Sequence, residues 1–330
     1  MPVPPGLTIP PATDTPRPLV HIGYHKTATS WLQVRLFVPA HGFWQILDHD
    51  EVFDLLVRPH GLRFDPARAG EAIEARLRAV EPGAVPVISS ELLSGHPFYG
   101  GRESDIYAER LARVLPRARI LVTIRNQLQL LPSLYMQYLE RGGTLPFARF
   151  FDGAETPGFF GFAPEHYEYD LLVARYQALF GSENVFVLPQ EALRQDLDAA
   201  GACLARFAGA AAYAGLRGAA RAPHAPSYPE GAQAVLRRAN HVRQSVLNPA
   251  PFVSIGGPRL SAYRLVGALS RRWPFRARTA RRHLVSDYVA RRFAGRFAAH
   301  NTRLSEIVCH ALDLSAYDRL AEPVDARDAG

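Results

Sequence analysis

Residues 19–32 read LVHIGYHKTATSWL, and this stretch decides how the chain folds. An apolar run leads into a short loop of glycine, hydroxyl-bearing and small residues, and a helical pattern follows. In such a corner the backbone N–H groups of residues 27–30 converge at the helix N-terminus, where the helix dipole also favours negative charge. The hydroxyls of Thr27, Thr29 and Ser30 add further donors. The stretch therefore predicts a loop that holds a phosphate-like anion.

The loop contains Lys26, which is the only lysine among the 38 basic residues of the chain. Because arginine serves everywhere else, we expect Lys26 to lie where a planar guanidinium cannot replace a compact ammonium. A Walker-type triphosphate loop requires glycine immediately before its lysine, and His25 stands there instead. This departure disfavours a nucleoside triphosphatase. An ordinary strand–loop–helix corner with a surface lysine is the alternative to an anion site.

The composition is that of a globular protein with a full core: 330 residues, of which 48% are hydrophobic and 21% charged. The net charge of +7 suits an anionic ligand, although an arginine-rich solvated surface explains it equally well. Residues 1–18 are proline-rich and lack an apolar signal core, so we expect a flexible N-terminal arm and a cytoplasmic protein. No uncharged apolar run is long enough to cross a bilayer. For the isolated Cys203 and Cys309 we expect two buried thiols rather than a disulfide.

Strand-like and helix-like segments alternate along the first two thirds of the chain. The alternation predicts an α/β fold, a P-loop-like parallel sheet flanked by helices, with ligands bound beyond the carboxyl ends of the strands. We assign this core to residues 19–207 and a mostly helical C-terminal part, beginning with an Ala-, Gly- and Pro-rich linker, to residues 208–330. The predicted strands are 19–23, 85–89, 120–124 and 185–188, and the predicted helices are 71–80, 104–115, 166–180 and 191–207.

A second anion site is predicted after the buried strand that leads to Arg125. Ser133 follows eight residues later, directly after Pro132. Because proline is tolerated in the first helical turn and disfavoured in the interior, we expect a helix to start near Pro132, with Ser133 in its first turn. A strand-end guanidinium and a first-turn hydroxyl make a phosphate cradle. Taken by itself, this segment favours the structural alternative, in which Arg125 pairs with a carboxylate and Ser133 caps a helix.

The two anion motifs together resemble the sulfotransferase family that uses 3′-phosphoadenosine 5′-phosphosulfate (PAPS). HIGYHKTATSWLQ is similar to the 5′-phosphosulfate loop of that family, with Ala28 where glycine is usual, and Arg125…Ser133 matches its 3′-phosphate element. Residues 167–193 resemble the segment that supports the sheet, and residues 297–317 resemble the tail of bacterial members. The resemblance implies that Arg125 and Ser133 hold the 3′-phosphate and that no metal is required. It assigns the 5′-phosphosulfate to Lys26, Thr27, Ala28, Thr29 and Ser30.

Sulfuryl transfer also needs a general base for the acceptor hydroxyl and a positive charge at the leaving phosphate oxygen, which the resemblance assigns to Lys26. Glu91 follows Ser89 and Ser90 at the end of a predicted strand, and we take it as the first candidate base because the carbohydrate-modifying branch of the family uses glutamate. His96 and His25 are the alternatives, since other branches use histidine. A salt bridge to Arg125 or another arginine would instead make Glu91 structural.

We therefore expect an enzyme that transfers sulfuryl from PAPS to a hydroxyl of a glycan, a glycolipid or a small natural product. A P-loop nucleotide kinase and a non-catalytic nucleotide- or anion-binding module are the competing functions. Aromatic residues of the loops 94–102 and 151–164, and the region after residue 222, are expected to face the acceptor. The candidate aromatic residues are Phe98, Tyr99, Phe159, Phe160 and Phe162, several of which we expect in the core.

Nine arginines lie between Arg271 and Arg296, interleaved with aromatic residues. A solvated or internally paired helical face is the favoured interpretation of this basic stretch, and a peripheral contact with an anionic membrane is the minority one. No nucleic-acid motif accompanies the stretch, so we expect no nucleic-acid partner. The identity of the acceptor and the oligomeric state are left open by the sequence.

Overall fold

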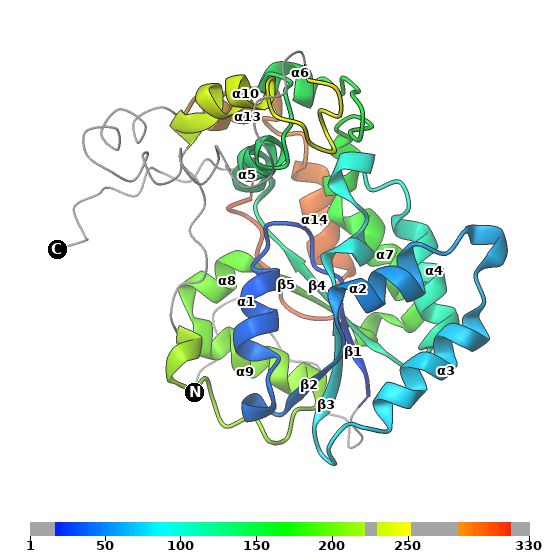
Figure 1. Cartoon of the computed structure of the whole chain (residues 1–330). Helices are drawn as coiled ribbons and strands as arrows, with labels where there is room; N and C mark the ends of the chain where they lie inside the picture. Colours follow the sequence, from blue (N-terminus) through cyan, green and yellow to red (C-terminus); the bar gives the residue numbers. More distant parts are fainter. Residues whose placement is uncertain (1–16, 222–229, 252–282, 318–330) are drawn as a thin grey trace.

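The computed structural model of the protein describes residues 17–221, 230–251 and 283–317 (Figure 1). Within these ranges five strands form one parallel sheet in the order β2-β3-β1-β4-β5. The fold is therefore α/β, as the alternation predicts. Because β1 lies between β3 and β4, the loops that follow these three strands meet at one edge of the sheet. The strands are β1 (Leu19–His21), β2 (Phe43–Leu47), β3 (Val85–Ser89), β4 (Arg119–Ile124) and β5 (Val185–Pro189).

Strand β2 is the one that the sequence patterning did not predict. It lies at the edge of the sheet and pairs with β3 alone in the described chain. Gln45 is exposed in its centre and the register shifts between Gln45 and Leu47, so neither a continuous apolar run nor a strict alternation marks the strand. The other four strands lie within two residues of their predicted bounds.

Two hydrophobic cores lie on opposite faces of the sheet. Successive strand residues point to opposite faces, so Leu19 belongs to one core and Val20 to the other. Helices α1, α8 and α9 supply the Leu19 core, while α3, α4, α5, α7, α10, α13 and α14 supply the Val20 core. The α-helices are α1 (Thr29–Trp31), α2 (His49–Val52), α3 (Pro66–Leu77), α4 (Ser104–Val114), α5 (Gln127–Glu140), α6 (Phe147–Phe151), α7 (Tyr169–Phe180), α8 (Gln190–Gln195), α9 (Leu197–Ala208), α10 (Gln233–Asn240), α13 (Leu284–Arg292) and α14 (Ala298–Ile307).

Capping residues explain where the helices depart from their predicted bounds. The helix predicted over 191–207 is two helices, because Asp196 ends α8 and caps α9 by accepting a hydrogen bond from the backbone N–H of Ala199. Asp65 caps α3 in the same way, so that this helix begins at Pro66, five residues before its predicted start. The periodic pattern alone revealed neither the break at Asp196 nor the start of α3 after Asp65.

The prediction for helix α5 was wrong. The helix begins at Gln127, where the side chain of Asn126 accepts a hydrogen bond from the backbone N–H of Leu128, and Pro132 lies inside it. Ser133 therefore lies in the second turn. The helix accommodates Pro132 at the cost of one backbone hydrogen bond, so proline did not mark the first turn here.

The described C-terminal segments pack on the α/β core. Helix α13 lies against α5, and α14 lies against α7 (Figure 1). The tail contributes buried residues and specific hydrogen bonds: Asn301 Oδ1 accepts from Gln127 Nε2 at 2.8 Å, and Tyr317 donates to Glu191 at 2.8 Å. Five residues of the segment 297–317 that are similar to the bacterial tail are all buried: Phe297, Asn301, Leu304, Leu314 and Tyr317.

Several further predictions meet the structure here. Cys203 is buried as expected, but Cys309 is exposed in the turn after α14, which corrects the prediction of two buried thiols. None of the helices in the described ranges is long and apolar enough to cross a membrane. Most of the predicted N-terminal arm and most of the basic stretch 271–296 lie outside the described residues. Of the basic stretch, Arg292 and Arg296 are paired with carboxylates, Arg296 with buried Glu168.

Candidate functional site

The loop after β1 has an unusual backbone. Beyond the strand, the N–H groups of Ile22 and Tyr24 still donate to β4, at 2.9 and 3.0 Å. The chain then turns sharply through Lys26, with φ of 67°, and Ala28, with φ of 69°. These two are the non-glycine residues with positive φ in the part of the chain that the structure describes. Because left-handed backbone costs such residues roughly 1–2 kcal/mol each, the surrounding structure must hold this loop in place.

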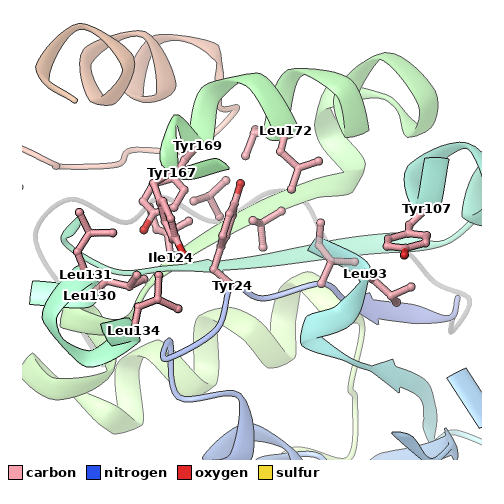
Figure 2. Packing of buried hydrophobic residues seen from close by; sticks show 14 of the residues in the cluster. Tyr24, Leu93, Tyr107, Ile124, Leu130, Leu131, Leu134, Tyr167, Tyr169 and Leu172 are labelled. Atoms are coloured by element: carbon pink, nitrogen blue, oxygen red, sulfur yellow. The ribbon is translucent and has the colours of Figure 1, made fainter. Parts of the chain in front are cut away.

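Tyr24 anchors the loop to the core (Figure 2). Its buried ring lies 4.7 Å from that of Tyr169 and 6.3 Å from that of Tyr167, centroid to centroid. The hydroxyl of Tyr169 in turn donates to the backbone carbonyl of Arg125 at 2.7 Å. One aromatic cluster thus supports both predicted anion elements.

The loop keeps several hydrogen-bond donors unused. The backbone N–H groups of Lys26, Thr27 and Ala28 donate to no group among the described residues, and Ala28 is the residue before the first turn of α1. The hydroxyl of Thr29 is buried and has no partner in the same ranges. The Thr27 hydroxyl differs, because it is buried and donates to the carbonyl of Tyr24. The free donors of the loop are therefore mainly backbone N–H groups and the Thr29 hydroxyl.

Lys26 is half-buried among charged groups. Burial lowers the pKa of its ammonium, the nearby Glu140 raises it, and Arg125 and Arg141 lower it further. The ammonium makes no ion pair within the described chain. A cation that is crowded by two guanidinium groups and left without a partner is a good receptor for an anion.

The structure brings Arg125 to the same loop. Its Nη1 donates to the Lys26 carbonyl at 3.4 Å and to the hydroxyl of Ser133, a residue of α5, at 3.3 Å. The Nε–H of Arg125 is buried and has no partner among the described residues. Burial and the neighbouring Arg194 lower the pKa of Arg125 to about 10, although Glu191 opposes this. The guanidinium stays charged near neutral pH and keeps a donor for a second anion.

The candidate bases lie after β3. Glu91 begins a 3₁₀ turn (Glu91–Ser94) that is capped by Ser90. Its half-buried carboxylate forms neither a hydrogen bond nor an ion pair with any residue of the described ranges, so the alternative of a salt bridge to Arg125 does not hold. His96 follows in the same connection, and its ring lies 5.6 Å from that of His25.

Both histidines are neutral near pH 7. Burial and then Arg141 lower the pKa of His96 to about 4, and burial, followed by His96, His166, Arg141 and Lys26, lowers that of His25 well below its usual value. The Nδ1 of His96 accepts the backbone N–H of Phe98 at 3.2 Å. A neutral imidazole with an accepting Nδ1 carries its proton on Nε2, so His96 presents a donor there. The Nε2 of His25 is buried and unpartnered within the described residues.

Sequence reasoning missed three charged residues around the site. Glu140 and Arg141, at the end of α5, act on the pKa of Lys26, and Glu191 accepts from the backbone N–H of Asn126 at 3.1 Å beside Arg125. Glu140 and Arg141 follow Ser133 on the same helix, which was the available signal. Among the aromatic candidates, Phe98, Phe159 and Phe162 are core residues, whereas Tyr99 and Phe160 are exposed and contact each other.

The described residues contain no cluster of three or more His, Cys, Asp or Glu side chains arranged to hold a metal ion. The candidate site therefore consists of the positively charged loop after β1, the Arg125–Ser133 pair after β4 and the Glu91–His96 connection after β3. All three follow neighbouring strands of one parallel sheet, as ligand sites of such sheets do.

Comparison with known proteins yields matches at the level of structure. No family model and no curated protein sequence matches the chain. A sulfotransferase from Alicyclobacillus acidocaldarius superimposes with a TM-score of 0.51 at 17% identity, over 93% of this chain and 100% of that one. A mouse sulfotransferase, SULT7A1 complexed with PAP, is matched with a TM-score of 0.37 at 13% identity, over 89% and 90% of the two chains. The bacterial match shows that the chain has a sulfotransferase-like fold.

Proposed function

We propose that the protein is a PAPS-dependent sulfotransferase that moves a sulfuryl group to a hydroxyl of a small molecule or glycan. The contact of Arg125 with both Lys26 and Ser133 carries this proposal. This contact joins the two predicted anion motifs through a single side chain, although Lys26 and Arg125 are 99 residues apart along the chain. A ligand with two separate anionic groups, such as a nucleotide with 5′ and 3′ substituents, suits such a pair better than a single phosphate does.

The unused donors fit the two ends of this nucleotide. The N–H groups of residues 26–28, the Thr29 hydroxyl and the exposed Ser30 would hold the 5′-phosphosulfate. Thr27 takes part through its backbone, since its hydroxyl proton is used internally. The orphaned Nε–H of Arg125 would hold the 3′-phosphate. Ser133 would join it by turning its hydroxyl proton away from the backbone carbonyl of Gln129, to which it donates at 3.3 Å.

In the reaction, bound PAPS supplies a sulfuryl group on a good leaving group, its 5′-phosphate. Lys26 would stabilise the charge that builds on the leaving phosphate oxygen, because its ammonium is compact and has no internal partner. Because Lys26 and Ala28 already have left-handed backbone, the loop would present its donors without first changing conformation.

We propose Glu91 as the general base that removes the proton from the hydroxyl of the acceptor substrate. Its carboxylate is unpaired within the described chain and follows the strand next to β1. His96 would act as a hydrogen-bond donor, since its Nδ1 is occupied by Phe98 and its proton sits on Nε2. His25 is the alternative base, because its buried Nε2 is unpartnered among the described residues. The C-terminal part, residues 208–330, would shape the acceptor site.

Ligand-dependent thermal stability tests the proposed function. We expect adenosine 3′,5′-bisphosphate to raise the melting temperature well above the shift given by ATP, GTP or adenosine 5′-phosphate. Arg125→Gln should remove the advantage of the bisphosphate over adenosine 5′-phosphate, since the 3′-phosphate then loses its guanidinium. A shift with ATP alone would instead support a kinase. A bisphosphate shift without release of that product from PAPS, across pools of hydroxyl acceptors, would support a non-catalytic binding module.

A further inference from the structure

A relay of four buried side chains, joined by hydrogen bonds, runs beneath the anion loop. The hydroxyl of Ser89 on β3 lies 2.8 Å from His21 Nδ1, and His21 Nε2 lies 2.9 Å from the hydroxyl of Thr123 on β4. Thr123 lies 2.7 Å from the hydroxyl of Thr27, which donates to the carbonyl of Tyr24. All four side chains are at most 5% exposed. The relay therefore connects three strands of the sheet to the loop that carries Lys26.

The terminal hydrogen bond, from Thr27 to the Tyr24 carbonyl, determines the direction of all the others. The Tyr24 carbonyl can only accept, so the single hydroxyl proton of Thr27 points at it. Thr27 must then accept from Thr123, whose only proton is used in this bond. Thr123 must in turn accept from an N–H of His21.

The direction also selects the tautomer of the imidazole. The atom of His21 that faces Thr123 is Nε2, so the proton of the neutral ring lies on Nε2. Nδ1 is then an acceptor, and the Ser89 hydroxyl donates to it. Burial lowers the pKa of His21 to about 3, which keeps the ring neutral. Every hydrogen bond of the relay thus has one donor and one acceptor, and none of the four side chains is charged.

Gly23 leaves the space that this arrangement needs. A Cβ at this position would lie 1.9 Å from the Thr123 hydroxyl oxygen and 2.4 Å from His21 Nε2. The bond between His21 and Thr123 therefore passes directly against the loop backbone at Gly23. Movement of either side chain would be transmitted to the loop, because interiors are close-packed.

We propose that His21 is a positioning residue: as the Nε2–H tautomer it holds Thr123 and, through it, Thr27, so that the loop of residues 23–30 keeps the backbone that binds the 5′-phosphosulfate. The role of the loop rests on the proposed function. The held conformation includes the left-handed Lys26 and Ala28, whose backbone strain requires such support. His21 acts through Thr27 and does not touch the donor itself.

The tautomer is tested first, without any ligand. A two-dimensional ¹⁵N–¹H long-range correlation spectrum of the histidine-labelled protein, with His21 assigned by its loss in His21→Gln, should show the Nε2–H form unchanged from pH 5 to pH 8. An Nδ1–H form, or titration in this range, would overturn the inference. This readout stays valid even if the protein binds no nucleotide.

The positioning role is tested by exchanging the threonine that His21 contacts. Thr123→Val removes the relay but keeps the shape, and should weaken binding of adenosine 3′,5′-bisphosphate about tenfold, the cost of one buried hydrogen bond. Thr123→Ser restores the hydroxyl and should bind within about twofold of the wild type. Thr156→Val, which removes a buried hydroxyl with no partner among the described residues, is the matched control and should bind normally.

The outcomes separate the two proposals. If the wild type does not bind the bisphosphate, the proposed function fails, and the spectrum alone decides the state of His21. If the wild type binds and Thr123→Val binds equally well, the loop does not depend on the relay and the positioning role is wrong. Equal losses in the valine and serine variants would also contradict it, since packing rather than the hydroxyl would then matter.

Discussion

The Nη1 of Arg125 lies 3.4 Å from the carbonyl oxygen of Lys26, so the guanidinium that follows β4 is bound to the centre of the loop that follows β1. The same atom donates to Ser133 at 3.3 Å. A single side chain therefore sets the distance between the two proposed anion-binding elements. Under the proposed function, a ligand that uses both elements would have to match this distance.

Replacement of Lys26 should abolish turnover. Lys26→Ala removes the only ammonium at the loop, and we expect the release of adenosine 3′,5′-bisphosphate from PAPS to slow by about a hundredfold or more. Lys26→Arg should also be severely impaired, because a wide guanidinium would have to fit beside Arg125 and Arg141. Arg78→Ala, at an exposed arginine far from the loop in sequence, is the control. Full activity of Lys26→Arg would show that the argument from the shape of lysine is wrong.

Glu91→Gln should separate chemistry from binding. The amide keeps the shape of the side chain but cannot accept a proton, so we expect kcat to fall by about a hundredfold or more while the Kd of adenosine 3′,5′-bisphosphate is unchanged. His96→Asn should lower kcat less, since its proposed role is to donate a hydrogen bond. If Glu91→Gln keeps a near-normal kcat, the base lies elsewhere, and His25→Gln is the next variant to measure.

Gly23→Ala should destabilise the protein strongly. Its Cβ would overlap the Thr123 hydroxyl and His21 Nε2, and overpacking of this kind costs about 1–3 kcal/mol or more. The matched control is Gly70→Ala in α3, where a Cβ meets nothing within 4 Å, and this variant should gain about 0.5–1 kcal/mol from better helix propensity. Urea unfolding measures both. Equal stability of the two variants would contradict the packing around Gly23.

Ala28→Gly should stabilise the protein. Ala28 has left-handed backbone with φ of 69°, and glycine adopts this conformation freely, so relief of the strain should add up to about 1 kcal/mol to the free energy of unfolding. Ala75→Gly in the exposed face of α3 has the opposite expectation, a loss of about 1 kcal/mol. A loss of stability in Ala28→Gly would show that the loop in solution does not hold this residue left-handed.

Acid should weaken the folded state through buried histidines. Burial lowers the pKa of both His21 and His166 to about 3 in the folded protein, against 6.5 for an ordinary histidine. The unfolded chain then binds protons that the folded chain cannot, so the stabilisation from each histidine is complete above pH 6.5 and declines as pH falls toward 3. Each should contribute a slope of about 1.4 kcal/mol per pH unit in that interval.

Urea unfolding between pH 7.5 and 4.5 checks this slope. His166→Gln lies outside the relay of His21 and should flatten the decline of the unfolding free energy by about 1.4 kcal/mol per pH unit below pH 6.5. His49→Gln, which removes an exposed histidine, is the control. An unaltered slope in His166→Gln would show that this histidine takes up its proton in the folded protein as well.

Local sequence determined much of the fold. The continuous apolar runs of β3, β4 and β5 indicated buried parallel strands. All five residues of β3 and all five residues of β5 are indeed buried. Strand β1 and the loop after it were visible in one stretch, because strand, glycine, hydroxyls and helix follow each other directly. The composition singled out Lys26. These features were readable because each depends on neighbours along the chain.

Other features depended on contacts between distant segments, and only the tertiary structure decided them. The sequence predicted Thr27 as a hydroxyl donor to the anion, but Thr123, 96 residues away, places that hydroxyl in the interior. It placed Ser133 in a first helical turn, whereas Asn126 starts α5 earlier, and packing of α5 tolerates Pro132. Edge strand β2 is marked only by its pairing with β3.

The candidate site shows the same division. Sequence spacing identified Arg125, Ser133 and Glu91 as residues that follow strands, but the order of the sheet put those strands next to β1. The charges that act on Lys26, and the tail residue Tyr317 that binds Glu191 beside Arg125, come from elements far along the chain. A sequence pattern reports which groups are present, whereas hydrogen-bond direction, pKa and the pairing of charges depend on three-dimensional distance, which only the packed fold provides.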